Sequence, residues 1–145
     1  MEERTFLENH AVRLVGSPAT WAAAACYTDW TDITGFRRID FLVGNGELDG
    51  DMSIKVYEAT SAAGANAQEV DTGLRATFHN GADEDMAGLI EVLAEDLTTG
   101  YPYVALLVTP GATDSFCAFA VLSEPYGNEL VGNDTTDGVA FATSL

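Results

Sequence analysis

An acidic loop is the part of this sequence whose residue types best suit chemistry. Glu47, Asp49 and Asp51 alternate with other residues. Glu58 stands where a twelve-residue EF-hand loop starting at Glu47 would place its last Ca²⁺ ligand. The sixth position of such a loop requires Gly, and here it is Met52, after which the chain alternates like a strand. We therefore interpret the acids as a solvated loop between strands and predict no bound metal.

The other side chains able to bind metals or act in catalysis are dispersed along the chain. His10 and His79 are the only histidines, and neither has companions at the spacing of a zinc site. Asp83–Asp85 are adjacent acids in an expected turn, where carboxylates usually face water. The sequence has no Gly-x-Ser-x-Gly elbow and no phosphate-binding glycine loop. We expect no catalytic residues and no cofactor, and we predict that the protein is not an enzyme.

Two further groups of residues are candidates for binding a ligand or a partner. Arg37 and Arg38 are adjacent bases in an acidic chain, and they suit either a charged strand edge or a contact with a partner's acidic patch. Four aromatic residues suit a sugar-binding face, although in a β-sandwich such residues more often fill the core or an interface. They are Trp21, Tyr27, Trp30 and Tyr57.

Composition and charge restrict the classes of partner. The 145 residues suffice for one domain, and 47% are hydrophobic. The formal net charge of −17 repels phosphate backbones and anionic membranes, so we expect neither nucleic-acid nor membrane binding. The longest apolar run, residues 21–26, is far too short to span a bilayer, and residues 1–4 lack the pattern of a signal peptide. We expect Cys26 and Cys117 to be small buried thiols in a protein made in cytoplasm.

The elements that position these residues are predicted to be strands. Between residues 36 and 57, Ile39, Phe41 and Val43 recur at period two, as do Met52, Ile54 and Val56. This alternation predicts two strands with one buried face each. We interpret them as an antiparallel pair that holds the acidic loop, residues 44–51.

The rest of the chain continues the pattern. We predict strands at residues 10–15, 74–79 and 86–97, and interpret residues 20–33 as a strand despite their helix-favouring alanines. We expect residues 59–73 to form a loop that crosses from one sheet to another, with residues 68–70 touching an edge. Residues 101–109 and 115–123 are apolar enough for buried strands, and we predict that they form a hairpin.

The predicted fold class is all-β: a β-sandwich with extended N- and C-terminal arms. The boundaries expected are an arm at 1–9, a sandwich at 10–125 and an arm at 126–145. The arms carry isolated apolar residues that cannot form a core by themselves, so we expect them to contact a neighbouring subunit. The candidate contacts in the arms are Phe6, Leu7, Leu130, Val131, Phe141 and Leu145.

Several segments together resemble the virion structural proteins of tailed bacteriophages and prophages. Such proteins resemble those of the capsid decoration (cement) type. The resemblance covers roughly residues 28–125. It is carried by residues 29–36, 39–43, 48–61, 100–112 and 119–125.

The resemblance implies that the sandwich is jelly-roll-like and that the protein is non-enzymatic and lies on the exterior of a capsid. Its expected partners are the major capsid protein and copies of itself, most often as a trimer, and the family offers no catalytic residues. Small contacts repeated on a lattice give high avidity. The alternatives are a structural protein of the tail or head–tail junction, and a free calcium- or carbohydrate-binding module.

Overall fold

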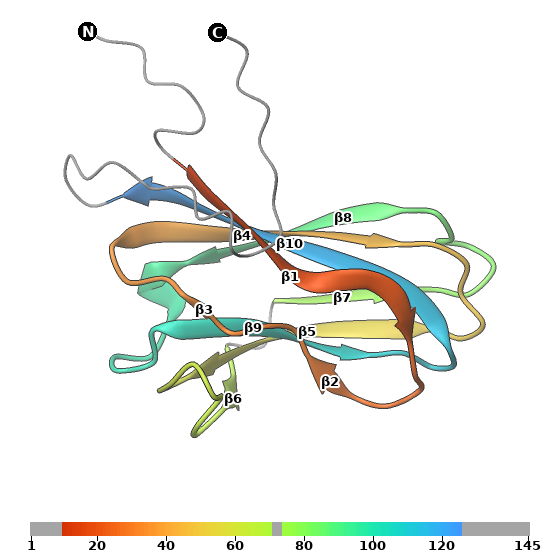
Figure 1. Ribbon diagram of the computed structural model, residues 1–145, viewed down its shortest axis with the longest axis horizontal. Coiled ribbons are helices and arrows are strands. Elements are labelled where there is room, and N and C mark those ends of the chain that lie inside the picture. Colours follow the sequence, from red (N-terminus) through yellow and green to blue (C-terminus); the bar gives the residue numbers. More distant parts are fainter. Residues whose placement is uncertain (1–9, 71–73, 126–145) are drawn as a thin grey trace, which may run out of the picture.

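The computed structural model describes residues 10–70 and 74–125, which form two antiparallel β-sheets packed face to face (Figure 1). The first sheet has the strand order β1-β10-β4-β8. The second has the order β2-β9-β5-β6, with β3 also pairing with β9 and β7 with β5. The elements are β1 (His10–Trp21), β2 (Cys26–Tyr27), β3 (Thr31–Asp32), β4 (Phe36–Asn45), β5 (Met52–Ala59), β6 (Gln68–Glu69), β7 (Arg75–Phe78), β8 (Ala87–Leu93), the 3₁₀ turn η1 (Ala94–Asp96), β9 (Tyr103–Thr109) and β10 (Asp114–Pro125).

The strand order is that of a jelly roll, which confirms the predicted fold class. The short strands β2 and β3 share one position beside β9, and β6 and β7 share one beside β5. Each sheet therefore has four positions, and the chain changes sheet at nearly every connection, as in a double Greek key. The expected arms at 1–9 and 126–145 lie outside the described residues, so the predicted boundaries stay a prediction.

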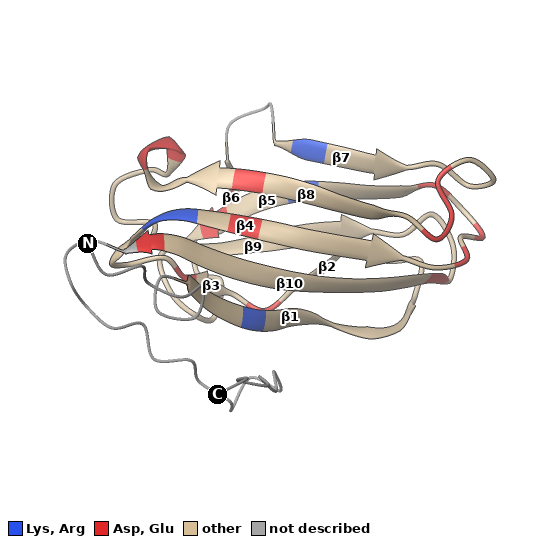
Figure 2. Cartoon of the chain, turned by 90° about the horizontal axis from the view of Figure 1, so that it is seen from above, with Lys and Arg blue, Asp and Glu red and all other residues tan. Residues whose placement is uncertain are grey.

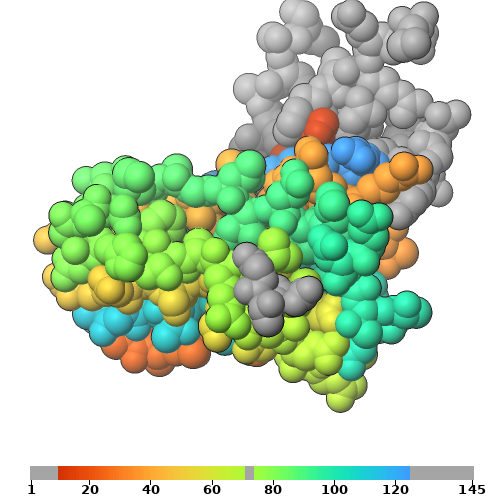
Figure 3. All heavy atoms as spheres, turned by 180° about the vertical axis from the view of Figure 1, so that it is seen from behind, coloured from red at the N-terminus to blue at the C-terminus, as the bar shows by residue number. Residues whose placement is uncertain are grey.

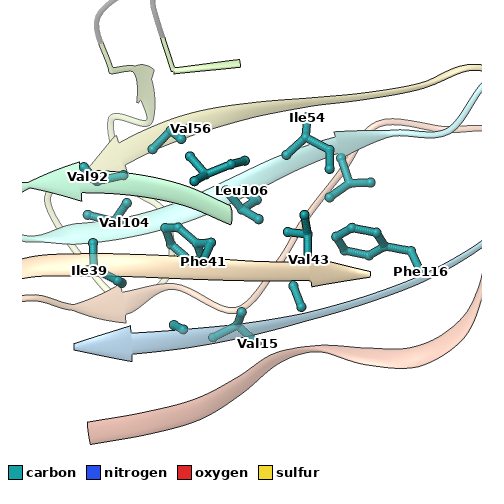
Figure 4. Packing of buried hydrophobic residues seen from close by; sticks show 14 of the residues in the cluster. Val15, Ile39, Phe41, Val43, Ile54, Val56, Val92, Val104, Leu106 and Phe116 are labelled. Carbon is teal, nitrogen blue, oxygen red and sulfur yellow. The ribbon is translucent and has the colours of Figure 1, made fainter. Parts of the chain in front are cut away.

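The core confirms the alternation read from the sequence. Each of the six apolar residues predicted to be buried in β4 and β5 is at most 2% exposed. Phe41 of β4 points across the sandwich toward Val104 and Leu106 of β9 (Figure 4). Side chains from both sheets thus interdigitate in one core, as expected for facing sheets about 10 Å apart.

Both predicted strand pairs are wrong, although the strands exist. β4 pairs with β10 and β8, whereas β5 pairs with β6, β7 and β9, so the acidic loop crosses between the sheets. β9 and β10 likewise lie in opposite sheets, and residues 110–113 connect them without forming a hairpin turn. Alternation shows that a strand buries one face, but it does not show which strand lies beside it.

Other segments differ from the prediction in extent. β1 continues to Trp21 through Gly16–Pro18, where two register shifts absorb the irregular residues. Ala22–Ala25 are exposed and join the sheets, so the strand predicted over residues 20–33 is reduced to two short pieces, β2 and β3. The loop at 59–73 returns to the sheet it left, because β6 and β7 both pair with β5. The strand predicted at 74–79 is confirmed as β7, whereas the one predicted at 86–97 ends at Leu93 as β8 and is followed by the 3₁₀ turn η1.

Candidate partner-binding face

Four large apolar side chains form a row across the outer face of the first sheet. The strand register places Leu14 opposite Phe119, Phe119 opposite Leu42, and Leu42 opposite Leu89. Residues directly opposite one another in antiparallel strands point to the same face, and here that face lies away from the core. We call Leu14, Phe119, Leu42 and Leu89 the apolar row.

Two members of the apolar row, Leu42 and Leu89, are open to solvent. Leu42 is 47% exposed and Leu89 is 63% exposed, while Leu14 and Phe119 are half-buried. On one side of the row lie the small residues Gly44 and Ala87 with Cys117. Figure 2 shows that β4 carries no charge beyond Asp40 and that β10 carries none between its two ends. An apolar surface on so acidic a chain is unusual, and such surfaces mark sites of protein contact.

The charged end of this face is centred on Arg38. Its Nε lies 3.1 Å from Asp40 Oδ2 and also 3.1 Å from the Ser123 hydroxyl. Its Nη1 lies 3.3 Å from a carboxylate oxygen of Glu91 and 3.8 Å from one of Glu124. The Arg38 guanidinium therefore pairs with acids of its own chain.

Arg37 is exposed and lies near Leu93, Glu95 and Glu124. It is placed at the same end of the sheet as Arg38, but the two consecutive side chains lie on opposite faces of β4. The contact of Arg37 and Arg38 with a partner stays a prediction.

At this end of the face, the surroundings of Asp40 disfavour the ionised form of its carboxyl. Burial raises the pKa of its carboxyl above 3.8, Arg38 opposes that rise, and Glu91 adds to it. Its Oδ1 atom is buried without a hydrogen-bond partner. A raised carboxyl pKa in the folded state means that ionisation of Asp40 costs stability.

We expect Asp40→Asn to be at least as stable as the unchanged protein at neutral pH. The folded state retains the Asp40 proton above pH 3.8, so this group's contribution to stability falls as pH rises from 3.8 through its folded pKa. Urea unfolding of both proteins across this range measures the effect. Their difference in unfolding free energy should shrink as pH falls below 3.8, and a growing difference on acidification would contradict the assignment.

The acidic loop is held by a buried carboxylate rather than arranged around a metal. Asp114, the first residue of β10, is fully buried, and its Oδ1 accepts hydrogen bonds from the backbone N–H groups of Asp49 and Gly50 at 2.7 and 3.2 Å. Within residues 10–70 and 74–125, no three His, Cys, Asp or Glu side chains converge as metal ligands. Glu58 is also buried, and its carboxylate accepts from Gln68 Nε2 and from the Thr98 N–H.

The two histidines contact different parts of the protein. His79 Nδ1 is 3.3 Å from Asp51 Oδ2. Two contacts hold the pKa of the Asp51 carboxyl below its ordinary value. The larger effect comes from the N–H of Asn80 and the smaller one from the His79 side chain. His10 begins β1 opposite Ser123. The Asp51–His79 contact thus joins the acidic loop to the turn after β7.

Three of the four candidate aromatic residues meet on the outer side of the second sheet. The Tyr27 ring lies 5.0 Å from Trp30 and 5.4 Å from Tyr57 between centroids, with interplanar angles of 40° and 70°. The Gly64 backbone lies against the Trp30 indole, where a Cβ would come within 2.6 Å of Nε1. Burial and the adjacent Tyr57 raise the pKa of Tyr27. Rings tilted against one another pack together instead of offering a flat platform for a sugar.

The expectation that both cysteines are buried is corrected for Cys26, and the expectation about the arm residues lies outside the described part of the chain. Cys26 is exposed, because it sits where the chain joins the two sheets, and only Cys117 is partly buried. Both thiols are free. The arm residues proposed as partner contacts lie outside the described residues; they are Phe6, Leu7, Leu130, Val131, Phe141 and Leu145.

Sequence reasoning missed the apolar row, although one signal for it was present. Leu42 falls out of phase with the buried residues of β4, and Leu89 falls out of phase with Ile90 and Val92 of β8. A large apolar residue on the polar side of an alternating strand is a candidate contact. That the two leucines are neighbours depends on the pairing of β4 with β8.

Comparisons with known proteins give a fold but no family. No family model matches the chain. No curated protein matches it. The structure is similar to that of the SPBc2 prophage-derived protein YomS, with 11% identity, 80% of this chain and 94% of that chain covered, and a TM-score of 0.52. It also matches a Bacillus endospore appendage structure (14% identity; 81% and 90% covered; TM-score 0.49) and the Tobacco streak virus coat protein (8%; 81% and 87%; 0.43).

At these identities the likeness to YomS establishes the shared β-sandwich and nothing about activity. In the described part of the chain, no helix has the length and apolar character that crossing a membrane would need.

Proposed function

We propose that this protein is a non-enzymatic structural component of a phage-type virion. In this proposal it binds the outside of an assembled shell through its first sheet and reinforces the shell as a decoration protein. The observation that carries the proposal is the apolar row, whose leucines remain 47% and 63% exposed on a chain of net charge −17.

Three features support this proposal. The fold is shared with a prophage-derived protein, which makes a virion setting the natural one to test. Among the described residues, no three His, Cys, Asp or Glu side chains converge as metal ligands. The acidic remainder of the surface disfavours non-specific association, so contact is concentrated on the apolar row. The expected partner is the major capsid protein, and the location is the virion exterior.

Co-sedimentation with shells assembled from the accompanying major capsid protein tests the proposal. We expect the unchanged protein to pellet with shells and to remain in solution alone. The double variant Leu42→Glu, Leu89→Glu should lose binding, because burying each leucine is worth about 1.5–3 kcal/mol, or about ten-fold or more in affinity. Pelleting with tails and not with shells would favour the tail alternative and overturn the proposal.

A matched control separates loss of the face from loss of the fold. Glu91→Gln lies on β8 two residues from Leu89 and changes charge without changing the apolar row. We expect it to retain shell binding, and all three proteins should show the same two-state unfolding. If the leucine variant unfolds normally and still pellets with shells, the first sheet is not the contact face.

A further inference from the structure

The two long edges of the sandwich differ, and one of them is open. At the first edge β7 and β8 close together: Phe78 is 8% exposed, and a Cβ on Gly88 would lie 3.4 Å from the Phe78 ring. Figure 3 shows these two strands, in neighbouring shades of green, side by side with no gap. At the opposite edge β1 and β2 diverge and leave a cleft of about 600 Å³. We call this hollow the edge cleft.

The edge cleft is lined mostly by small residues, together with two aromatic side chains. Trp21 of β1 and Tyr27 of β2 both line it. Four alanines line it as well, and their short side chains leave room that larger incoming side chains would fill; they are Ala19, Ala22, Ala24 and Ala25. Among the described residues that line it, Asp29 alone is charged. Such a surface suits an uncharged apolar segment rather than a polar small molecule.

The edge cleft is held in place at both ends. The N–H of Asp29 donates to the Val15 carbonyl at 2.8 Å, which ties the two sheets together beside the cleft. The Trp21 ring packs edge-on against Phe116 of the core, with centroids 5.1 Å apart. In the described part of the chain β1 pairs only with β10, so its other edge faces the cleft. A preformed cleft reduces the ordering cost of binding.

One segment of this chain outside the described residues has the matching chemistry. In residues 139–145, Val139, Phe141 and Leu145 alternate with small residues, and the segment carries no charged side chain. Seven residues of strand are as long as the cleft wall from Val15 to Trp21. Residues 1–9 fit less well, because they contain three acids and their apolar pair, Phe6 and Leu7, would point to opposite faces.

The geometry favours a segment from another copy. Ser123 pairs with His10 and Asp114 with Trp21, so the chain leaves β10 at the end of β1 remote from the cleft. The shortest path for a segment of the same chain runs beside β1 in the same direction, whereas one from a second copy can enter antiparallel, the more stable arrangement. An uncharged segment also escapes the repulsion between two chains of charge −17.

We propose that residues 139–145 of a second copy of this chain occupy the edge cleft. The large side chains of the segment fill the space above the alanines, and each copy both gives a segment and receives one. Such a head-to-tail contact closes into a ring when the rotation between copies permits, as in a trimer. This contact uses the edge of the sandwich and not the apolar row, so it stands independently of shell binding.

Disulfide trapping in the full chain tests this contact. Cys26 is exposed and lines the cleft, which makes it a native reporter. In a Cys117→Ala background, Phe141→Cys places a second thiol on the face of the segment that enters the cleft, and Ala140→Cys places it on the opposite face. With diamide as the oxidant, two thiols give up two electrons and two protons to form each disulfide. Non-reducing electrophoresis then separates multi-chain from single-chain products.

The expected result is multi-chain species from Phe141→Cys, formed on the order of ten-fold faster than from Ala140→Cys, because docking raises the effective thiol concentration. Cys26→Ser should abolish them. An internal disulfide within one chain would overturn the second-copy assignment. Equal rates for the two cysteine variants, or no trapping by either, would overturn the cleft as the binding site. These experiments contain no shells, so their failure leaves shell binding to be decided by co-sedimentation.

Discussion

Replacing Asp114 by Ala is expected to lower the free energy of unfolding by about 3 kcal/mol. Hydrogen bonds to a charged group contribute about 1.5–3 kcal/mol each, and the N–H groups of Asp49 and Gly50 lose their shared acceptor together. The loop that crosses between the sheets would then lack its anchor to β10. Urea denaturation followed by tryptophan fluorescence measures the change.

Asp114→Asn is the informative companion to that variant. The amide retains Oδ1 as an acceptor, and its nitrogen replaces Oδ2, an oxygen that is buried without a partner. We expect Asp114→Asn to cost about 1 kcal/mol or less. Asp49→Ala keeps the backbone N–H and should be nearly neutral. If Asp114→Asn were as damaging as Asp114→Ala, the negative charge itself would be required, and a cation at this loop would have to be reconsidered.

Replacing Gly111 by Ala is expected to cost about 1–3 kcal/mol, the usual range for forcing extra volume into a packed site. A Cβ at Gly111 would lie 2.6 Å from the carbonyl oxygen and 2.9 Å from the nitrogen of Asp51. Both are backbone atoms, so neither can rotate away. The loops after β4 and after β9 would have to separate, and thermal unfolding should show a lowered midpoint.

Substitutions at two other glycines serve as comparisons for Gly111→Ala. Gly50 meets the same crowding from the opposite loop, since its Cβ would lie 2.7 Å from the Gly111 carbonyl carbon. Gly50→Ala should therefore be similarly destabilising. At Gly44 the nearest atom is the Cys117 sulfur at 3.3 Å, and a side chain can yield there. Gly44→Ala should be milder, and equal costs at Gly44 and Gly111 would contradict close packing of the two loops.

The apolar row and the edge cleft lie on different parts of the sandwich and suit different partners. The apolar row lies on an outer sheet face, the surface that we propose to bind a shell. The edge cleft is a narrow hollow, well matched to one extended segment. A protein that uses both would bind a lattice and its own neighbours at once, and combining weak contacts in this way raises avidity.

The amino-acid sequence by itself determined the fold class and the buried faces. Ile39, Phe41 and Val43 predicted one face of β4, and Met52, Ile54 and Val56 one face of β5, because alternation is a local property of a strand. It also predicted that the residues after the acidic loop form a strand, and Met52, which occupies the glycine position of an EF-hand loop, begins β5. The all-β class followed from several such strands and their connecting loops, whereas the jelly roll was implied only by the resemblance to virion proteins.

Only the tertiary structure decided which strands are neighbours, and the candidate surfaces depend on that. Leu42 and Leu89 are separated by 46 intervening residues, and only the pairing of β4 with β8 makes them one surface. Asp114 gains its role because β9 and β10 cross between sheets instead of forming a hairpin. Lateral pairing depends on the combined packing of distant segments, and a period-two pattern carries no information about it.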